Sequence, residues 1–193
     1  MCMTFNGYPL ARFNALTHPQ GGWVGCMKSH AALLEQLMKE DDSGMYTVLE
    51  DDCTILCPRD EFDTKWAKYQ LFLKQREGEW DLFTLGGIYV EPVRIVCRDP
   101  FVIECNWSVA IHFVVHSGRS AKTMIDYAAK DKWDTTCDNH LSRSHRGRIW
   151  IAYPMMCGWM RSASDISEEY QDRCSAAFDV SIKNLDEFVK EQS

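Results

Sequence analysis

Residues 45–56, MYTVLEDDCTIL, are the stretch from which the fold can be worked out. An aromatic and β-branched run, YTVL, ends abruptly at three consecutive acids, which is typical of a short buried strand. The sequence therefore predicts a strand whose carboxyl end carries Glu50, Asp51 and Asp52.

Helical and strand patterns alternate on both sides of this strand. Residues 25–40 and 60–77 carry apolar side chains at three- and four-residue intervals, which predicts two amphipathic helices. Residues 80–90, WDLFTLGGIYV, predict a second buried strand that runs into a turn at Gly86 and Gly87.

The second half of the chain continues the alternation. We expect a weak extended segment at 93–103, a strand at 108–116, a helix at 119–130, a polar connection at 133–147, a strand at 148–154 and an acidic helix near the C-terminus. This order predicts an α/β domain with a mostly parallel central sheet flanked by helices. The 193 residues suit a single domain, 1–193. Ligands of such sheets lie beyond the carboxyl ends of the strands.

The composition is that of an ordinary globular protein, with 46% hydrophobic, 12% aromatic and 25% charged residues. The 28 acidic against 21 basic residues give a net charge of −7, which argues against a nucleic-acid partner. No apolar run approaches the roughly 20 residues that span a membrane, and the first residues lack the pattern of a signal peptide. Nine cysteines without disulfide-like spacing favour a reducing compartment. We therefore expect a soluble, cytoplasmic protein.

The three acids point to metal chemistry. Adjacent carboxylates repel one another, and a divalent cation relieves this repulsion. In an extended backbone Glu50 and Asp52 share one side while Asp51 takes the other, so the outer pair can bind a hard cation such as Mn2+ or Mg2+ through oxygen. A solvated surface loop is the other interpretation. His112 and His116 alternate on one predicted strand, where packing is favoured over metal ligation.

Several short motifs occur in the order found in one enzyme family. They are R-F-N-A (12–15), G-C-x-x-S-H (25–30), L-E-D-D (49–52), W-D-L-F-T-L-G-G (80–87), V-A-I-H-F-V-V-H-S-G (109–118), D-N-H-L (138–141), and Y-P followed by S-D-I (153–154 and 164–166). Together they resemble glycosyltransferase family 25, which includes bacterial lipooligosaccharide and collagen galactosyltransferases; short enzymes of large DNA viruses are a looser resemblance. The resemblance covers residues 11–167 and leaves 168–193 as a C-terminal helical tail. The family's opening strand has no counterpart before Arg12.

The resemblance implies a GT-A-type fold and a glycosyltransferase domain. The donor would be a nucleotide-sugar, most simply a UDP-hexose, and the acceptor a glycan or glycoprotein, with inversion at the anomeric carbon. Glu50 and Asp52 would hold Mn2+ or Mg2+ at the donor's phosphates, with Asp51 also at the donor. The other residues that it assigns to the donor are Asn14, Ala15, Leu16, Ser29, His30, Gly86 and Gly87. Ser29 and His30 can equally fix the start of a helix, and the two glycines can form a plain turn.

Inversion also requires a base. A carboxylate on the opposite face of the sugar takes the proton of the acceptor hydroxyl. Asp138 in D-N-H-L is the candidate for this role, and Asp134 is the second choice. Asp138 can instead cap the helix that begins there.

Two other functions remain open. One is a catalytically silent module of the same fold that binds a nucleotide-sugar or a carbohydrate. The other is an α/β metal-dependent hydrolase that uses the same acids. Sugar transfer from a UDP-sugar in the presence of Mn2+ distinguishes the enzyme from the silent module. Phosphate release from simple phosphate esters would indicate the hydrolase.

Overall fold

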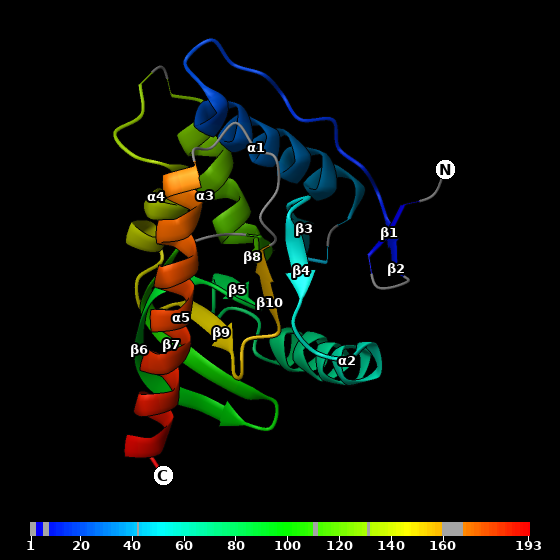
Figure 1. Cartoon of the computed structure of the whole chain (residues 1–193). Helices are drawn as coiled ribbons and strands as arrows, with labels where there is room; N and C mark the ends of the chain where they lie inside the picture. Colours follow the sequence, from blue (N-terminus) through cyan, green and yellow to red (C-terminus); the bar gives the residue numbers. More distant parts are fainter. Residues whose placement is uncertain (1–2, 6–7, 42, 110–111, 131, 160–167) are drawn as a thin grey trace.

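The computed structural model describes residues 3–5, 8–41, 43–109, 112–130, 132–159 and 168–193. At its centre lies a six-stranded sheet with the strand order β3-β8-β5-β9-β7-β6 (Figure 1). Its strands are β3 (Met45–Leu49), β5 (Leu82–Thr84), β6 (Ile88–Arg98), β7 (Phe101–Val109), β8 (Phe113–Ser117) and β9 (Ile149–Ala152). Two separate pairs are β1 (Met3–Phe5) with β2 (Tyr8–Leu10), and β4 (Cys53–Ile55) with β10 (Cys157–Trp159).

Helices cover both faces of the central sheet. They are α1 (Gly22–Glu40), α2 (Arg59–Gln75), α3 (Gly118–Ala128), α4 (Cys137–Ser144) and α5 (Glu168–Glu191). The core on one face joins side chains of α1, α3, α4 and α5, and the core on the other face is built on α2. Neighbouring residues of one strand, such as Val114 and Val115, enter opposite cores because side chains alternate across a sheet. The molecule is therefore a three-layer α/β structure.

The expectation of a mostly parallel sheet is wrong. Only β5 and β9 pair in parallel, and the other neighbours in this sheet pair antiparallel. The segment 93–103 spans the turn of a long hairpin, β6–β7, rather than one extended excursion. Register shifts at four points interrupt this hairpin, and such bulges bend a strand pair. A hairpin and an inserted antiparallel strand leave the same alternating pattern in the sequence as a parallel sheet with crossover helices.

The carboxyl ends of β3 and β5 nevertheless lie at one edge of the sheet. Both strands pair antiparallel with β8, which lies between them, so they run parallel to each other. The start of β8 lies at the same edge, because Leu49 pairs with Phe113. One residue further along, the Glu50 N–H donates a hydrogen bond of 2.9 Å to the His112 carbonyl. The acids after β3 and the residue before β8 are thus direct neighbours.

Most predicted helices are confirmed, with one addition. The periodic segments at 25–40, 60–77 and 119–130 correspond to α1, α2 and α3, and the C-terminal helix is α5. The expected polar connection at 133–147 contains the eight-residue helix α4, whose few apolar residues gave no periodic signal. In the described part of the chain the central sheet takes no strand from before β3. None of the described helices has the length and apolar character needed to cross a lipid bilayer.

Candidate metal centre

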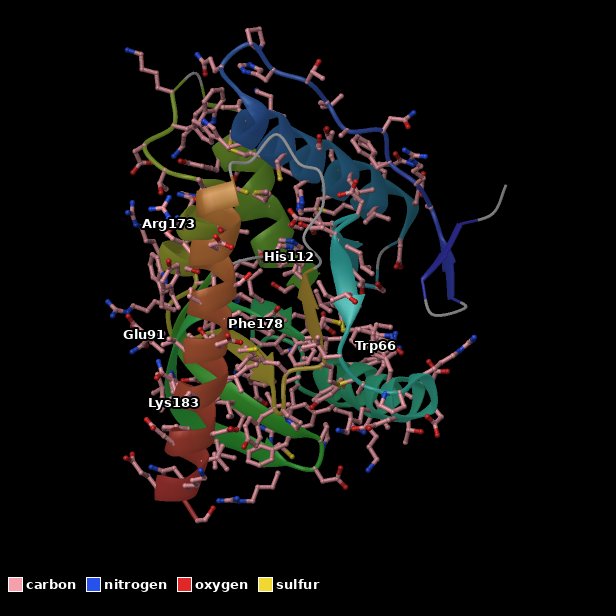
Figure 2. The ribbon with its side chains drawn as sticks, viewed as in Figure 1. Trp66, Glu91, His112, Arg173, Phe178 and Lys183 are labelled. Carbon is pink, nitrogen blue, oxygen red and sulfur yellow. The ribbon has the colours of Figure 1, made fainter. Side chains whose placement is uncertain are left out.

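Three side chains of different origin meet at the edge where β3 ends. Glu50 follows β3, Asp52 lies in the turn between β3 and β4, and His112 precedes β8. The His112 Nδ1 atom lies 3.0 Å from Glu50 Oε2 and 3.0 Å from Asp52 Oδ1. One ligand atom from each residue lies within 4.8 Å of the others. The side chains are only 19–27% exposed, so Glu50 and Asp52 form a compact cluster with His112. Figure 2 shows His112 relative to the labelled residues of α2 and α5.

The charges in this cluster stabilise one another. Burial disfavours the charged form of His112, but its hydrogen bonds to Asp52 and Glu50 prevail and raise its pKa to about 10. Burial would raise the pKa of Glu50, but hydrogen bonds from His112 and His30 hold it well below its ordinary value. Two carboxylate oxygens and one imidazole nitrogen can also bind a divalent cation. This donor set fits Mn2+ better than Mg2+, because Mg2+ is usually held by oxygen alone.

Glu50 has a second set of contacts on its buried side. Its Oε1 atom accepts a hydrogen bond of 3.5 Å from Cys26 Sγ and lies 3.3 Å from His30 Nε2. Burial disfavours protonation of His30, but hydrogen bonds to Cys26 and Glu50 raise its pKa to about 10. The two oxygens of one carboxylate thus face two different groups, Oε1 toward α1 and Oε2 toward His112.

The spacing of G-C-x-x-S-H explains how α1 serves this arrangement. Residues four apart lie on the same side of a helix, so the motif forms two neighbouring rows. In one row, Gly25 leaves room for the Leu16 carbonyl, where a Cβ would clash, and Ser29 Oγ accepts a 2.7 Å hydrogen bond from Leu16 N–H. In the other row, Cys26 and His30 face Glu50. One row holds the preceding loop, and the other holds the carboxylate.

The residues predicted at the donor lie in two different environments. Ser29 and His30 are buried, and Ser29 Oγ also donates to the Gly25 carbonyl at 2.7 Å. The resemblance assigned Asn14, Ala15 and Leu16 to the nucleotide base. In the structure these three residues belong to an exposed loop beside α1. The structure therefore links His30 to the cluster through Glu50 and holds the loop at Leu16 through Ser29.

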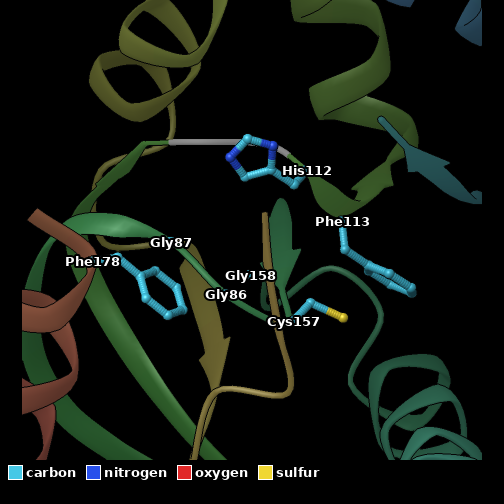
Figure 3. Close-up of a pocket in the computed structure, with 7 residues that line it drawn as sticks. All are labelled: Gly86, Gly87, His112, Phe113, Cys157, Gly158 and Phe178. Atoms are coloured by element: carbon cyan, nitrogen blue, oxygen red, sulfur yellow. The ribbon is translucent and has the colours of Figure 1, made fainter. Parts of the chain in front are cut away.

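Gly86 and Gly87 line a narrow recess next to His112 (Figure 3). A Cβ at Gly86 would clash with the Cys157 carbonyl of β10, and one at Gly87 would clash with Ser108 Oγ. The two glycines therefore allow segments of the chain itself to pack closely. The rings of Phe178 and Phe113 lie on opposite sides of the glycines. This packing accounts for the Gly-Gly pair without reference to a bound sugar.

The remaining predicted acids have other surroundings. Asp51 is exposed. Asp138 lies in the first turn of α4, where its Oδ1 accepts hydrogen bonds from Asn139 N–H, at 2.8 Å, and from the hydroxyl of Thr136, the N-cap residue. The exposed Asp134 accepts a hydrogen bond of 3.0 Å from the Tyr127 hydroxyl. The S-D-I motif at 164–166 lies outside the described residues.

Sequence reasoning undervalued His112 and missed Cys26. His112 had been weighed mainly as a packing residue, and that interpretation is correct for its neighbour His116. His116 is fully buried, its Nδ1 lies 2.8 Å from Ser120 Oγ, and burial lowers its pKa to about 3. In a parallel sheet the residue before a strand lies at the edge opposite the carboxyl ends. Because β8 is antiparallel to β3, His112 lies beside Glu50 instead.

Comparisons with known proteins add little to this description. Neither a protein-family model nor a curated protein matches the chain. A solved structure titled "Crystal Structure of A197 from STIV" is similar over 74% of this chain and 80% of that one, with 13% identical residues and a TM-score of 0.39. A similarity this low supports no argument about fold or function.

Proposed function

We propose that the chain is a metal-dependent glycosyltransferase with a GT-A-like domain. It would move a sugar, most simply a hexose from UDP-hexose, to a glycan or glycoprotein with inversion at the anomeric carbon. The observation that carries the proposal is the cluster of Glu50, Asp52 and His112 at the sheet edge where β3 and β5 end. The family resemblance of the motifs at 12–166 supplies the reaction class. The cysteine content favours a reducing compartment such as the cytoplasm.

Each residue of the cluster would have its own role in binding the metal and the donor. Asp52 and His112 hold a divalent cation together with the Oε2 side of Glu50, while Cys26 and His30 hold the Oε1 side in place. A bound Mn2+ ion would supply positive charge that stabilises the leaving nucleoside diphosphate. Asp51, which is exposed in the same turn, would face the donor from solvent.

Asp138 is proposed as the base that accepts the proton of the acceptor hydroxyl. It belongs to the first turn of α4, and the preceding residue, Cys137, is buried in the core that α4 shares with α1. The same helix α1 contacts Glu50 through Cys26 and His30. Asp138 is only half-buried, so an acceptor could approach it from solvent.

A silent binding module is the second candidate. The observation that favours it is the narrow recess beside His112, in which the chain's own backbone fills the space next to Gly86 and Gly87. Such a protein would bind a nucleotide-sugar in a metal-dependent way and transfer nothing.

The metal-dependent donor site is tested by ligand-induced stabilisation. We expect a UDP-sugar to raise the melting temperature of the full chain only when Mn2+ is present, because a ligand at about 100 times its Kd stabilises the folded state by about 2.7 kcal/mol. Asp52→Asn should abolish this shift, since the remaining ligands hold the cation poorly. Asp126→Asn, an exposed change on α3, is the matched control. Equal shifts in Asp52→Asn and the wild type would refute the site.

The assignment of the base is tested by measuring transfer with the same donor. Asp138→Asn should retain Mn2+-dependent donor binding but lower the rate of transfer by roughly 10²–10⁴-fold, the usual contribution of a general base. Asp134→Asn is the comparison variant. A large loss in Asp134→Asn with a normal rate in Asp138→Asn would reverse the assignment. Donor binding with no transfer by the wild type would favour the silent module.

A further inference from the structure

The buried side of Glu50 carries a second group of potential metal ligands. Cys26 Sγ, His30 Nε2 and Glu50 Oε1 all lie within 4.8 Å of one another. Neither Asp52 nor His112 belongs to this group. It therefore shares only the Glu50 carboxylate with the metal centre described above, and it uses the other oxygen of that carboxylate.

The separations between these atoms fit a tetrahedral ion. Zinc binds sulfur at about 2.3 Å and nitrogen or oxygen at about 2.0–2.2 Å, so neighbouring ligand atoms of a tetrahedron lie roughly 3.3–3.7 Å apart. The observed separations from Glu50 Oε1 are 3.5 Å to Cys26 Sγ and 3.3 Å to His30 Nε2. Cys26 and His30 are four residues apart on α1, so both side chains project from the same side of the helix.

A further thiol lies in the core beside α1. Cys137, the first residue of α4, is buried in the same core as apolar residues of α1. The interaction with Cys137, together with burial, raises the pKa of the Cys26 thiol above its ordinary value. A metal ion would replace the thiol proton, as it does whenever cysteine becomes a ligand.

The chemistry of the group differs from that of its neighbour. Thiolate and imidazole select Zn2+ over Mn2+ or Mg2+, whereas carboxylate oxygens select the harder ions. None of the eight cysteines in the described part of the chain forms a disulfide, so no disulfide prevents Cys26 from acting as a ligand.

We propose that Cys26, His30 and Glu50 Oε1 form a zinc site that joins α1 and the end of β3, with the fourth position of the tetrahedron left to water. Glu50 is a bridging carboxylate between this site and the cluster of Asp52 and His112. The site does not depend on the glycosyltransferase proposal, because its ligands other than Glu50 and its preferred ion differ from those of the neighbouring cluster. Zinc there would hold Glu50 in the orientation that the neighbouring cluster uses.

Cobalt spectroscopy tests the site in the full-length, metal-stripped protein. We expect one equivalent of Co2+ to produce a near-ultraviolet thiolate-to-cobalt charge-transfer band together with intense visible bands of tetrahedral Co2+, and Zn2+ to abolish both. Cys26→Ser should remove the charge-transfer band. Cys97→Ser, on the opposite edge strand β6, is the matched control and should retain it. Absence of the band from the wild type would overturn the proposal.

Two further measurements make the result specific. The Zn2+ affinity, measured by competition with a chromophoric chelator, should fall in Cys26→Ser by more than the roughly 10–100-fold typical of losing an outer-shell partner. In the wild type, Zn2+ should protect Cys26 from alkylation, as mapped by mass spectrometry, which needs no variant to fold. Persistence of the band in Cys26→Ser, or its loss in Cys57→Ser, would assign the thiolates elsewhere and refute the site.

The two metal proposals can fail separately. Asp52→Asn should keep the cobalt band while losing Mn2+-dependent binding of a UDP-sugar. Cys26→Ser should weaken Zn2+ binding while leaving the ligands Asp52 and His112 in place. A protein that binds UDP-sugars with Mn2+ but shows no thiolate band would leave the glycosyltransferase proposal intact and remove only the zinc site.

Discussion

The two carboxylate oxygens of Glu50 have different neighbours. Local sequence reasoning predicted that Glu50 and Asp52 would share a side, and in the structure both contact His112. The same reasoning could not predict Cys26 and His30 on the other oxygen, because they come from a helix some twenty residues earlier. The Glu50 side chain therefore links α1 with His112, and the sequence did not predict that these two segments lie close together.

Asp81 provides a stability prediction at the scale of one residue. Its carboxylate is buried and receives hydrogen bonds from Arg148 Nε at 2.8 Å and from His145 Nδ1 at 3.0 Å. Asp81→Asn leaves these donors without their charged partner, so the free energy of unfolding should fall by about 2–4 kcal/mol in urea denaturation. Asp126→Asn, which removes an exposed pair with Lys122, should change it by less than about 0.5 kcal/mol. Equal stabilities of the two variants would contradict this account.

The same interaction predicts a pH dependence. Burial would raise the pKa of Asp81, but hydrogen bonds from His145 and Arg148 hold it below its ordinary value of 3.8. A lowered pKa in the folded state means that the stabilisation is complete above that ordinary value and is lost as the pH falls through the lowered one. The difference in stability between wild type and Asp81→Asn should therefore shrink as the pH falls below about 4. A constant difference from neutral to acidic pH would show that Asp81 acts only by its shape.

Among the elements, α1 shows how one helix serves two purposes. The periodicity of residues 25–40 was sufficient to predict the helix, whose apolar residues are buried against the sheet. The polar residues of G-C-x-x-S-H were expected at the donor or at the helix start. Their four-residue spacing instead places Ser29 beneath the loop at Leu16 and His30 beside Glu50.

The helix α5 packs into the core and is hydrogen-bonded to the central sheet. Leu185 is fully buried in the core that α1, α3 and α4 also form, and Ser181 Oγ accepts a hydrogen bond from Val90 N–H of β6. Leu185→Ala should therefore lower the free energy of unfolding by about 2–5 kcal/mol, measured by chemical denaturation. Val180→Ala on the same helix is the control, because Val180 is 55% exposed and should cost no more than about 0.5 kcal/mol. A small effect of Leu185→Ala would show that α5 contributes little to the fold.

At the scale of the whole molecule, the sequence-based prediction was wrong mainly about the relative direction of the strands. The sequence pattern of strands and helices is the same for crossover helices and for hairpins, and the hairpin β6–β7 was read as one weak segment. The carboxyl ends of β3 and β5 still meet at one edge, because both pair with β8. The two strand ends on which the prediction relied therefore lie together although the sheet is mostly antiparallel.

Local chemistry alone was enough to predict the main helices, the buried strands and the placement of three acids at a strand end. These features depend on side-chain periods of 3.6 and 2 residues, which neighbouring residues set without reference to distant ones. Pairing between distant segments decided the rest: the antiparallel insertion of β8 brought His112 to Glu50, and packing of α1 on the end of β3 brought Cys26 and His30. Hydrogen-bonded strand pairing and core packing join residues far apart in the chain, so no window of the sequence contains them.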